Sequence, residues 1–169
     1  TDYNYKGGGL KVTEVLLGGP FDISTSRLEA GDIIEAIDDV VLAKGMDYYP
    51  LLNHKAGKAV KIRIRKVSGE IVEETIFPVT REKYDELIYQ RWMARNAEEV
   101  ERLSGGRIGY VHLDFMNKPA YHHLYLTSLG RYYHCDALVF DVRDNGGGSL
   151  HPRIEEFFSG TQYWTGGVR

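Results

Sequence analysis

The stretch Ala137-Leu-Val-Phe-Asp-Val-Arg-Asp-Asn-Gly-Gly-Gly-Ser149 decides the fold. Its first six residues are apolar except for one aspartate and rich in β-formers, which predicts a buried strand of a mostly parallel sheet. Three glycines follow at the carboxyl end of this strand, where open α/β sheets bind their ligands. Because glycine has no Cβ, a substrate backbone can lie against such a turn and meet bare N–H groups. The turn therefore has the chemistry needed to stabilise an oxyanion in acyl transfer.

The residues around this turn alternate between strands and helices. We expect strands at 108–113 and 137–142, and helices at 120–132 and from Ile154 onward. This order predicts a right-handed crossover between two neighbouring parallel strands. Two strands alone make a poor sheet, so we expect the domain to continue past Arg169 or to borrow strands from segments outside this chain.

A small β-rich unit is expected before this part. Strands are predicted at 10–17, 33–41, 60–67 and 70–77, with a tight turn at Asp38-Asp39 and a short helix at 46–55. Thr80 is a candidate N-cap for a long amphipathic helix at 81–103, which ends at Gly105-Gly106. The predicted fold class is thus α+β and α/β: a β-rich domain at 1–80, a linker helix at 81–104, and a βαβα portion with parallel strands at 105–169.

Composition excludes several classes of function. The chain has 169 residues, of which 43% are hydrophobic, and its net charge of −3 predicts no nucleic-acid partner. No apolar run reaches the length of a transmembrane helix, so no membrane insertion is expected. The single cysteine, Cys135, excludes an internal disulfide and a cysteine-based zinc site. The histidines follow no chelating pattern, and neither a metal nor a cofactor is expected.

The glycine turn resembles the Asp-x-Arg-x-Asn-x-Gly-Gly turn of the serine peptidases that include the C-terminal processing peptidases and the tricorn core peptidase. Tyr89-Gln-Arg-Trp92 and Ser104-Gly-Gly-Arg-Ile-Gly-Tyr-Val-His112 are also similar to the tricorn-type core. The resemblance implies a serine endopeptidase that hydrolyses peptide bonds by acyl transfer. Residues 105–169 would then be the amino-terminal part of its catalytic core.

The same resemblance implies roles for individual residues. Gly147 is the first choice for the oxyanion donor, flanked by Gly146 and Gly148, and Asn145 is expected to contact the substrate. The family's catalytic serine lies at a later strand-to-helix elbow, and tricorn-like members take a histidine from a segment before the first domain. Both groups are expected outside this chain, which implies that the fragment by itself is inactive.

Residues 1–80 resemble a PDZ domain of the permuted bacterial type. The matching pieces are Gly8–Val15, Leu28–Asp38 and Leu51–Gly57. PDZ domains bind an extended peptide by strand addition. The resemblance therefore implies a carboxylate-facing loop (Gly8, Gly9, Leu10), a pairing strand that begins with Lys11 and Val12, and an opposite wall from Leu51 to Lys55. Gly19-Pro20-Phe21 departs from the family's Gly-x-Pro-Ala, which leaves the register of the groove open.

Other interpretations of these segments remain. The glycines also suit a purely structural turn with a helix cap, whereas a phosphate loop lacks its Gly-Lys-Ser/Thr ending. Ser149 is expected to cap the helix that begins near Pro152.

The alternative function is a non-catalytic PDZ scaffold with a peptidase-like remnant. The expected partner is a peptide or protein substrate, and a homo-oligomer of the full-length protein stays open. The compartment is also open, with a periplasmic or extracytoplasmic location favoured over the cytoplasm.

Overall fold

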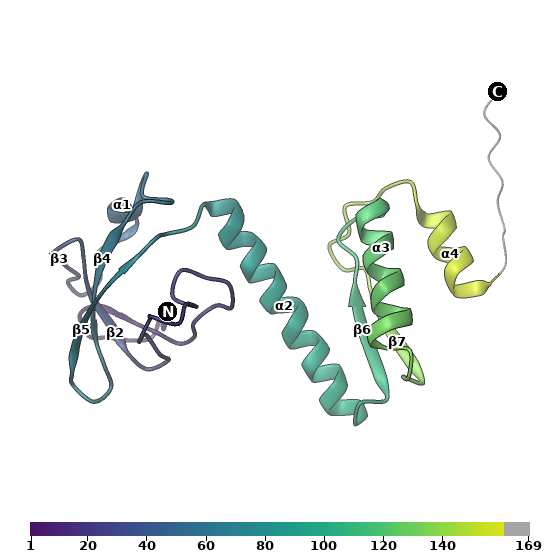
Figure 1. Cartoon of the computed structure of the whole chain (residues 1–169), viewed down its shortest axis with the longest axis horizontal. Helices are drawn as coiled ribbons and strands as arrows, with labels where there is room; N and C mark the ends of the chain where they lie inside the picture. Colours follow the sequence, from purple (N-terminus) through teal and green to yellow (C-terminus); the bar gives the residue numbers. More distant parts are fainter. Residues whose placement is uncertain (161–169) are drawn as a thin grey trace. The chain divides into compact units, whose positions relative to one another are not determined.

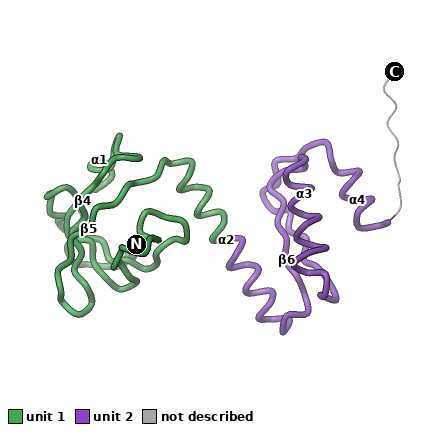
Figure 2. Tube along the Cα trace, viewed as in Figure 1, with its two compact units in different colours: residues 1–91 green, residues 92–169 purple. Residues whose placement is uncertain are grey.

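The computed structural model describes residues 1–160, and the chain divides into two compact units, Thr1–Arg91 and Trp92–Arg169 (Figure 2). The division falls inside helix α2, Arg81–Ser104, which matches the predicted linker helix almost to the residue. Thr80 caps this helix as expected, because its Oγ1 accepts a hydrogen bond from the Lys83 N–H at 3.2 Å. The domain boundaries at 80 and 104 stay predictions, and residues 161–169 of the last predicted domain lie outside the described part.

The first unit is built on an antiparallel sheet in the order β1-β2-β4-β5, with β3 paired to β2 (Figure 1). The strands are β1 Leu10–Lys11, β2 Ile33–Ile37, β3 Val40–Val41, β4 Val60–Arg65 and β5 Ile71–Ile76. The turn between β2 and β3 is the expected one: Asp38 and Asp39 have φ of 45° and 66°, as in a type I′ hairpin turn. The apolar residues of β4 (Val60, Ile62 and Ile64) are buried in the core, which confirms the predicted alternation.

Two predicted elements of this unit are much shorter than expected. The strand at 10–17 is β1 alone, which ends at Lys11, and the chain beyond it turns at Leu16–Gly19 with Leu17 85% exposed. The helix at 46–55 is the single turn α1, Tyr49–Leu52. Pro50 lies in its first turn and cannot lie in a helix interior, and His54 at φ 58° ends the helical conformation. Hydrophobic content alone overestimated the length of both elements.

The second unit carries a two-stranded parallel sheet. Strand β6, Ile108–His112, pairs with β7, Ala137–Asp141, in the register Ile108↔Ala137 to His112↔Asp141. The connection is helix α3, Lys118–Leu126, which continues as a π-helical turn, Thr127–Arg131, and β7 is followed by helix α4, His151–Ser159. The predicted strand–helix–strand–helix order with parallel strands is therefore confirmed (Figure 1). The core lies between the sheet and the helices and contains Val111, Leu113, Ala120, Leu124 and Ile154.

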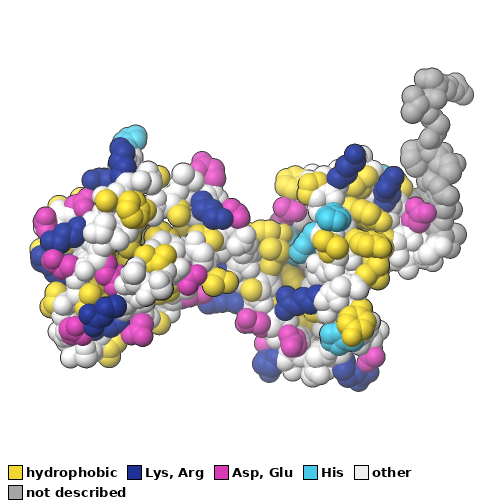
Figure 3. All heavy atoms as spheres, in the orientation of Figure 1, with side chains coloured by type: hydrophobic (Ala, Val, Ile, Leu, Met, Phe, Trp, Pro, Cys, Tyr) yellow, Lys and Arg dark blue, Asp and Glu magenta, His cyan; other side chains and the backbone are white. Residues whose placement is uncertain are grey.

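The prediction that β7 is buried was wrong. Ala137 and Val139 are exposed and only Asp141 is fully buried. Burial of a parallel strand depends on neighbours at both edges and on both faces, and β6 is the only strand that pairs with β7 within residues 1–160. Hydrophobic side chains also gather on the visible surface of this unit (Figure 3). Exposed apolar residues of this unit include Tyr125, Leu126, Leu129, Tyr133 and Phe158.

Candidate oxyanion turn

The glycine turn lies where β7 ends, and it is bonded to the segment that follows β6. The Gly146 N–H donates to the Asp114 carbonyl at 2.7 Å, and the Met116 N–H donates to the Gly147 carbonyl at 2.8 Å. Met116 and Gly148 form an isolated parallel bridge that extends the sheet by one position. Because both segments leave the carboxyl ends of parallel strands, they meet at one edge of the sheet.

The side chain of Asn145 bridges these two segments. Its Nδ2 donates to the Leu113 carbonyl at 2.8 Å, and its Oδ1 accepts the Gly147 N–H at 2.7 Å. Leu113 is 1% exposed, so one end of the amide is anchored in the core of the unit. Both polar ends of the residue that was expected to contact substrate are therefore engaged within the protein.

Only one of the three glycine N–H groups is free within the described residues. Gly146 donates to Asp114 and Gly147 donates to Asn145, whereas Gly148 donates to no atom of residues 1–160. In a trans peptide the C=O and the N–H point in opposite directions. Because the Gly147 carbonyl faces Met116, the Gly148 N–H in the same peptide unit points away from that segment. The turn thus presents one unpaired backbone donor on its outer side.

Position 148 requires glycine because the Met116 backbone lies too close for a side chain. A Cβ built on Gly148, whose φ is 140°, would lie 2.4 Å from the Met116 carbonyl oxygen. A Cβ on Gly146 would lie 2.3 Å from the Phe115 ring, whereas a Cβ on Gly147 would meet no atom of residues 1–160 within 4 Å. Gly147 has φ of 84°, so only its conformation favours glycine there.

A buried carboxylate braces the start of the turn. Asp141 accepts hydrogen bonds from the Arg143 backbone N–H at 3.0 Å and from the Arg143 guanidinium, and its Oδ2 also accepts the Tyr110 hydroxyl at 2.7 Å. The Arg143 hydrogen bonds hold the pKa of Asp141 far below its ordinary value, against the opposing effect of burial. Burial and the neighbouring Asp141 raise the pKa of Tyr110. Sequence reasoning missed this cluster, although a lone aspartate within an apolar strand was its signal.

A cavity of about 460 Å³ opens beside this cluster. It is lined by residues of α2, β6 and β7 and by the first residues of the turn: Asn96, Glu99, Val100, Tyr110, Val139, Phe140, Asp141, Val142 and Arg143. The Asn96 amide donates to the Tyr110 hydroxyl at 3.1 Å, which connects this part of α2 to the hydrogen bonds around Asp141. The cavity follows β7 on the side where the exposed Val139 lies.

Comparison with known proteins decides what this arrangement resembles. Residues 107–164, which contain β6, β7 and the turn, match Peptidase family S41. The chain is 28% identical over 166 residues to the tricorn protease of Thermoplasma volcanium, which covers 92% of this chain. It is also 32% identical over 133 residues to tricorn protease homolog 1 of Streptomyces coelicolor, which covers 76% of the chain. The resemblance to the tricorn-like peptidases is confirmed.

The likeness extends to a solved structure. The crystal structure of the tricorn protease superposes on 75% of this chain with a TM-score of 0.64 at 29% sequence identity. The tricorn-like chain is nevertheless short: it spans 16% of the Thermoplasma volcanium protein and 12% of the Streptomyces coelicolor protein. The expectation that it resembles a fragment agrees with these lengths.

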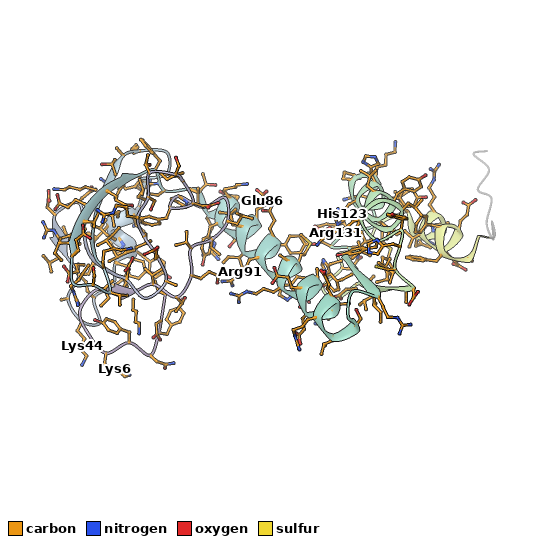
Figure 4. The ribbon with its side chains drawn as sticks, turned by 60° about the horizontal axis from the view of Figure 1, so that its bottom comes forward. Lys6, Lys44, Glu86, Arg91, His123 and Arg131 are labelled. Atoms are coloured by element: carbon orange, nitrogen blue, oxygen red, sulfur yellow. The ribbon has the colours of Figure 1, made fainter. Side chains whose placement is uncertain are left out.

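Ser149 and the histidines are the other polar groups that the sequence singled out. Ser149 does not cap α4: the N-cap is Leu150 and no side chain caps the helix, so that prediction was wrong. His112 is buried, and its Nε2 lies 2.8 Å from the Arg143 carbonyl. His123 lies on α3 (Figure 4), and within residues 1–160 no three His, Cys, Asp or Glu side chains are grouped to hold a metal ion. Over the same residues no helix is long and apolar enough to cross a membrane.

The predicted peptide groove of the first unit is partly occupied by the chain itself. The Gly9 N–H donates to the Leu42 carbonyl at 2.8 Å, and the Lys11 carbonyl accepts the Asp2 N–H at 2.8 Å. Lys55 is paired with Asp38 at 2.9 Å. Of the remaining groove residues, Leu10 and Leu51 pack on the core and Val12 belongs to it, whereas Gly8 is exposed. Peptide binding at this groove stays a prediction.

Proposed function

We propose that the second unit supplies the oxyanion-stabilising turn of a serine endopeptidase, which hydrolyses peptide bonds by acyl transfer. The observation that carries this proposal is the Gly148 N–H, which has no partner within residues 1–160 and lies in a turn inside the segment that matches Peptidase family S41. Gly147, the first choice from the sequence, has its N–H bonded to Asn145. We therefore propose Gly148 as the donor.

Stabilisation of an oxyanion requires a hydrogen-bond donor whose position is fixed before the reaction. When the nucleophile attacks the scissile carbonyl, negative charge develops on the oxygen, and a preorganised N–H stabilises that charge without reorganisation. Removal of one such donor typically costs about 3–4 kcal/mol of transition-state stabilisation. The bonds from Gly146 and Met116 hold the turn on the edge of the sheet, which supports such a role. The serine nucleophile and its base are proposed to lie outside this chain.

The first unit is proposed to bind or gate peptide substrates by strand addition at β1. Main-chain pairing would supply affinity there, and α1 would form the opposite wall of the groove. The short edge strand β1, with one carbonyl turned away from β2, supports this proposal.

An active-site serine probe tests the proposed function. The full-length protein should cleave an unstructured protein and be labelled by a fluorophosphonate probe at a serine outside residues 1–169. The isolated 169-residue chain should not be labelled, and clear labelling of Ser149 would contradict the proposal. A full-length protein that binds peptides but neither cleaves nor reacts with the probe would support the scaffold function instead.

A further inference from the structure

We propose that Asn145 is the positioning residue of the oxyanion turn, because its side chain holds the Gly147 N–H next to Gly148, the one glycine of the turn whose N–H has no partner within residues 1–160. This inference rests on the proposed peptidase function. It gives Asn145 a role different from the substrate contact that the sequence suggested. Asn145 occupies the Gly147 N–H and Asp114 occupies the Gly146 N–H, so only the Gly148 N–H stays available within residues 1–160.

The bridge needs both a donor and an acceptor on one short side chain. The Asn145 Nδ2 donates to the Leu113 carbonyl at 2.8 Å, while its Oδ1 accepts from Gly147 at 2.7 Å. Asparagine supplies both groups on one planar amide, whereas an ionised aspartate can only accept. The anchor is firm, because the Leu113 N–H donates in turn to the Asp141 carbonyl at 3.0 Å, across the sheet.

The turn needs such a bridge at Gly147. A Cβ added at Gly147 would meet nothing within 4 Å among residues 1–160, so side-chain packing does not hold the residue in place. Glycine also has wide conformational freedom, so the peptide between Gly147 and Gly148 can rotate unless hydrogen bonds hold it. The Gly147 carbonyl is held by Met116 and its N–H is held by Asn145. Together these two bonds fix the direction of the Gly148 N–H.

Loss of the bridge should therefore affect the reaction and not the affinity for substrate. We expect Asn145→Ala in the full-length enzyme to lower kcat on the order of 100-fold, as loss of an oxyanion donor does, with KM changed less than twofold. Asn145→Asp keeps the acceptor but loses the donor to Leu113, and we expect a similar loss of kcat. In the 169-residue chain, Asn145→Ala should shift the NMR amide resonances of Gly147 and Gly148 and abolish the exchange protection of the Gly147 N–H.

The matched control is Asn117→Ala in the same unit. Asn117 caps α3 by accepting the Ala120 N–H at 3.0 Å, so this substitution also removes an asparagine hydrogen bond but leaves the turn untouched. It should lower thermal stability with kcat unchanged. Full kcat in Asn145→Ala or Asn145→Asp would overturn the inference while leaving the peptidase function intact. A raised KM with unchanged kcat would also overturn it, in favour of substrate contact, and an inactive wild-type enzyme would overturn the peptidase function together with the inference.

Discussion

Gly147 and Gly148 are neighbours that differ sharply in their tolerance of a side chain. We expect Gly148→Ala to destabilise the second unit by more than about 3 kcal/mol, because its Cβ would lie 2.4 Å from the Met116 carbonyl oxygen. Gly147→Ala should cost only about 1–2 kcal/mol, the price of a left-handed conformation without a clash. Thermal unfolding followed by circular dichroism compares the two variants, and equal losses would contradict this account of the turn.

Asp141 should make the second unit sensitive to acid. Its pKa in the folded protein lies below the value of about 3.9 expected for an unfolded chain. Its contribution to stability is therefore complete above about pH 4 and is lost as the pH falls further toward the folded pKa. At neutral pH we expect Asp141→Asn to cost about 1–2 kcal/mol, since the exposure of Arg143 screens part of the attraction.

Amide hydrogen exchange in β6 and β7 measures this effect. The difference in protection between wild type and Asp141→Asn should be largest near neutral pH and should shrink below about pH 4. The control is Asp136→Asn, whose carboxylate is 61% exposed in its pair with Arg107, and it should change little. A difference in protection that grows toward acid pH would contradict the claim that folding lowers the pKa of Asp141.

The glycine turn shows which features of the site can be predicted from the sequence and which cannot. Three consecutive glycines after an apolar strand predict a turn with bare N–H groups. Which N–H stays free depends on Asp114, Asn145 and Met116, and two of these follow the other strand of the sheet. Such contacts are set by the tertiary fold, so the local pattern favoured Gly147, whereas Gly148 is the glycine whose N–H has no partner within residues 1–160.

Among the elements, helix α2 is long but is attached to the first unit through few residues. Leu87 is its only fully buried residue among those described, with 3% exposure, and it lies against Gly18. Arg91, which is labelled in Figure 4, adds an ion pair to Glu14 at 2.9 Å. We expect Leu87→Ala to lower the free energy of unfolding of the first unit by about 2–4 kcal/mol, the usual cost of a cavity. Urea denaturation followed by circular dichroism gives this value.

Leu103 supplies the matched control for that substitution. It lies on the same helix but is 70% exposed, so Leu103→Ala should change stability by less than about 0.5 kcal/mol. Similar effects of both substitutions would mean that Leu87 does not anchor α2 to the first unit.

Elements with strong local signals were predictable and the others were not. Val60–Arg65 alternates apolar and basic residues, Thr80 caps α2, and Asp38-Asp39 forms the expected turn, all from short-range chemistry. The exposure of β7 was not predictable, because it depends on the number of strands that flank it. The early end of β1 at Lys11 was likewise not predictable, because the apolar residues continue to Leu17 without a local signal for the end of the strand.

At the scale of the whole molecule, the chain joins a predicted peptide-binding unit to a predicted catalytic one. The first of these expectations depends on an edge of β1 that can accept another strand. Leu10 pairs with Ile34, and the Val12 N–H donates to the Asp32 carbonyl, so the backbone groups of Lys11 between them face away from β2. The Lys11 carbonyl is the group that an incoming peptide would use first, and in this structure it accepts the Asp2 N–H.

A peptide with a free hydrophobic carboxyl terminus should therefore compete with the chain's own Asp2. Asp2→Pro removes the N–H donor and frees the Lys11 carbonyl, whereas Asp2→Ala keeps the N–H and serves as the control. Because one hydrogen bond contributes about 1 kcal/mol, the Asp2→Pro variant should bind the peptide about fivefold more tightly than wild type or Asp2→Ala. Backbone amide NMR shifts at residues 8–15 and 51–55 report binding, and amidation of the peptide should abolish them. If none of the three proteins responds to millimolar peptide, this chain does not bind peptides by strand addition at β1.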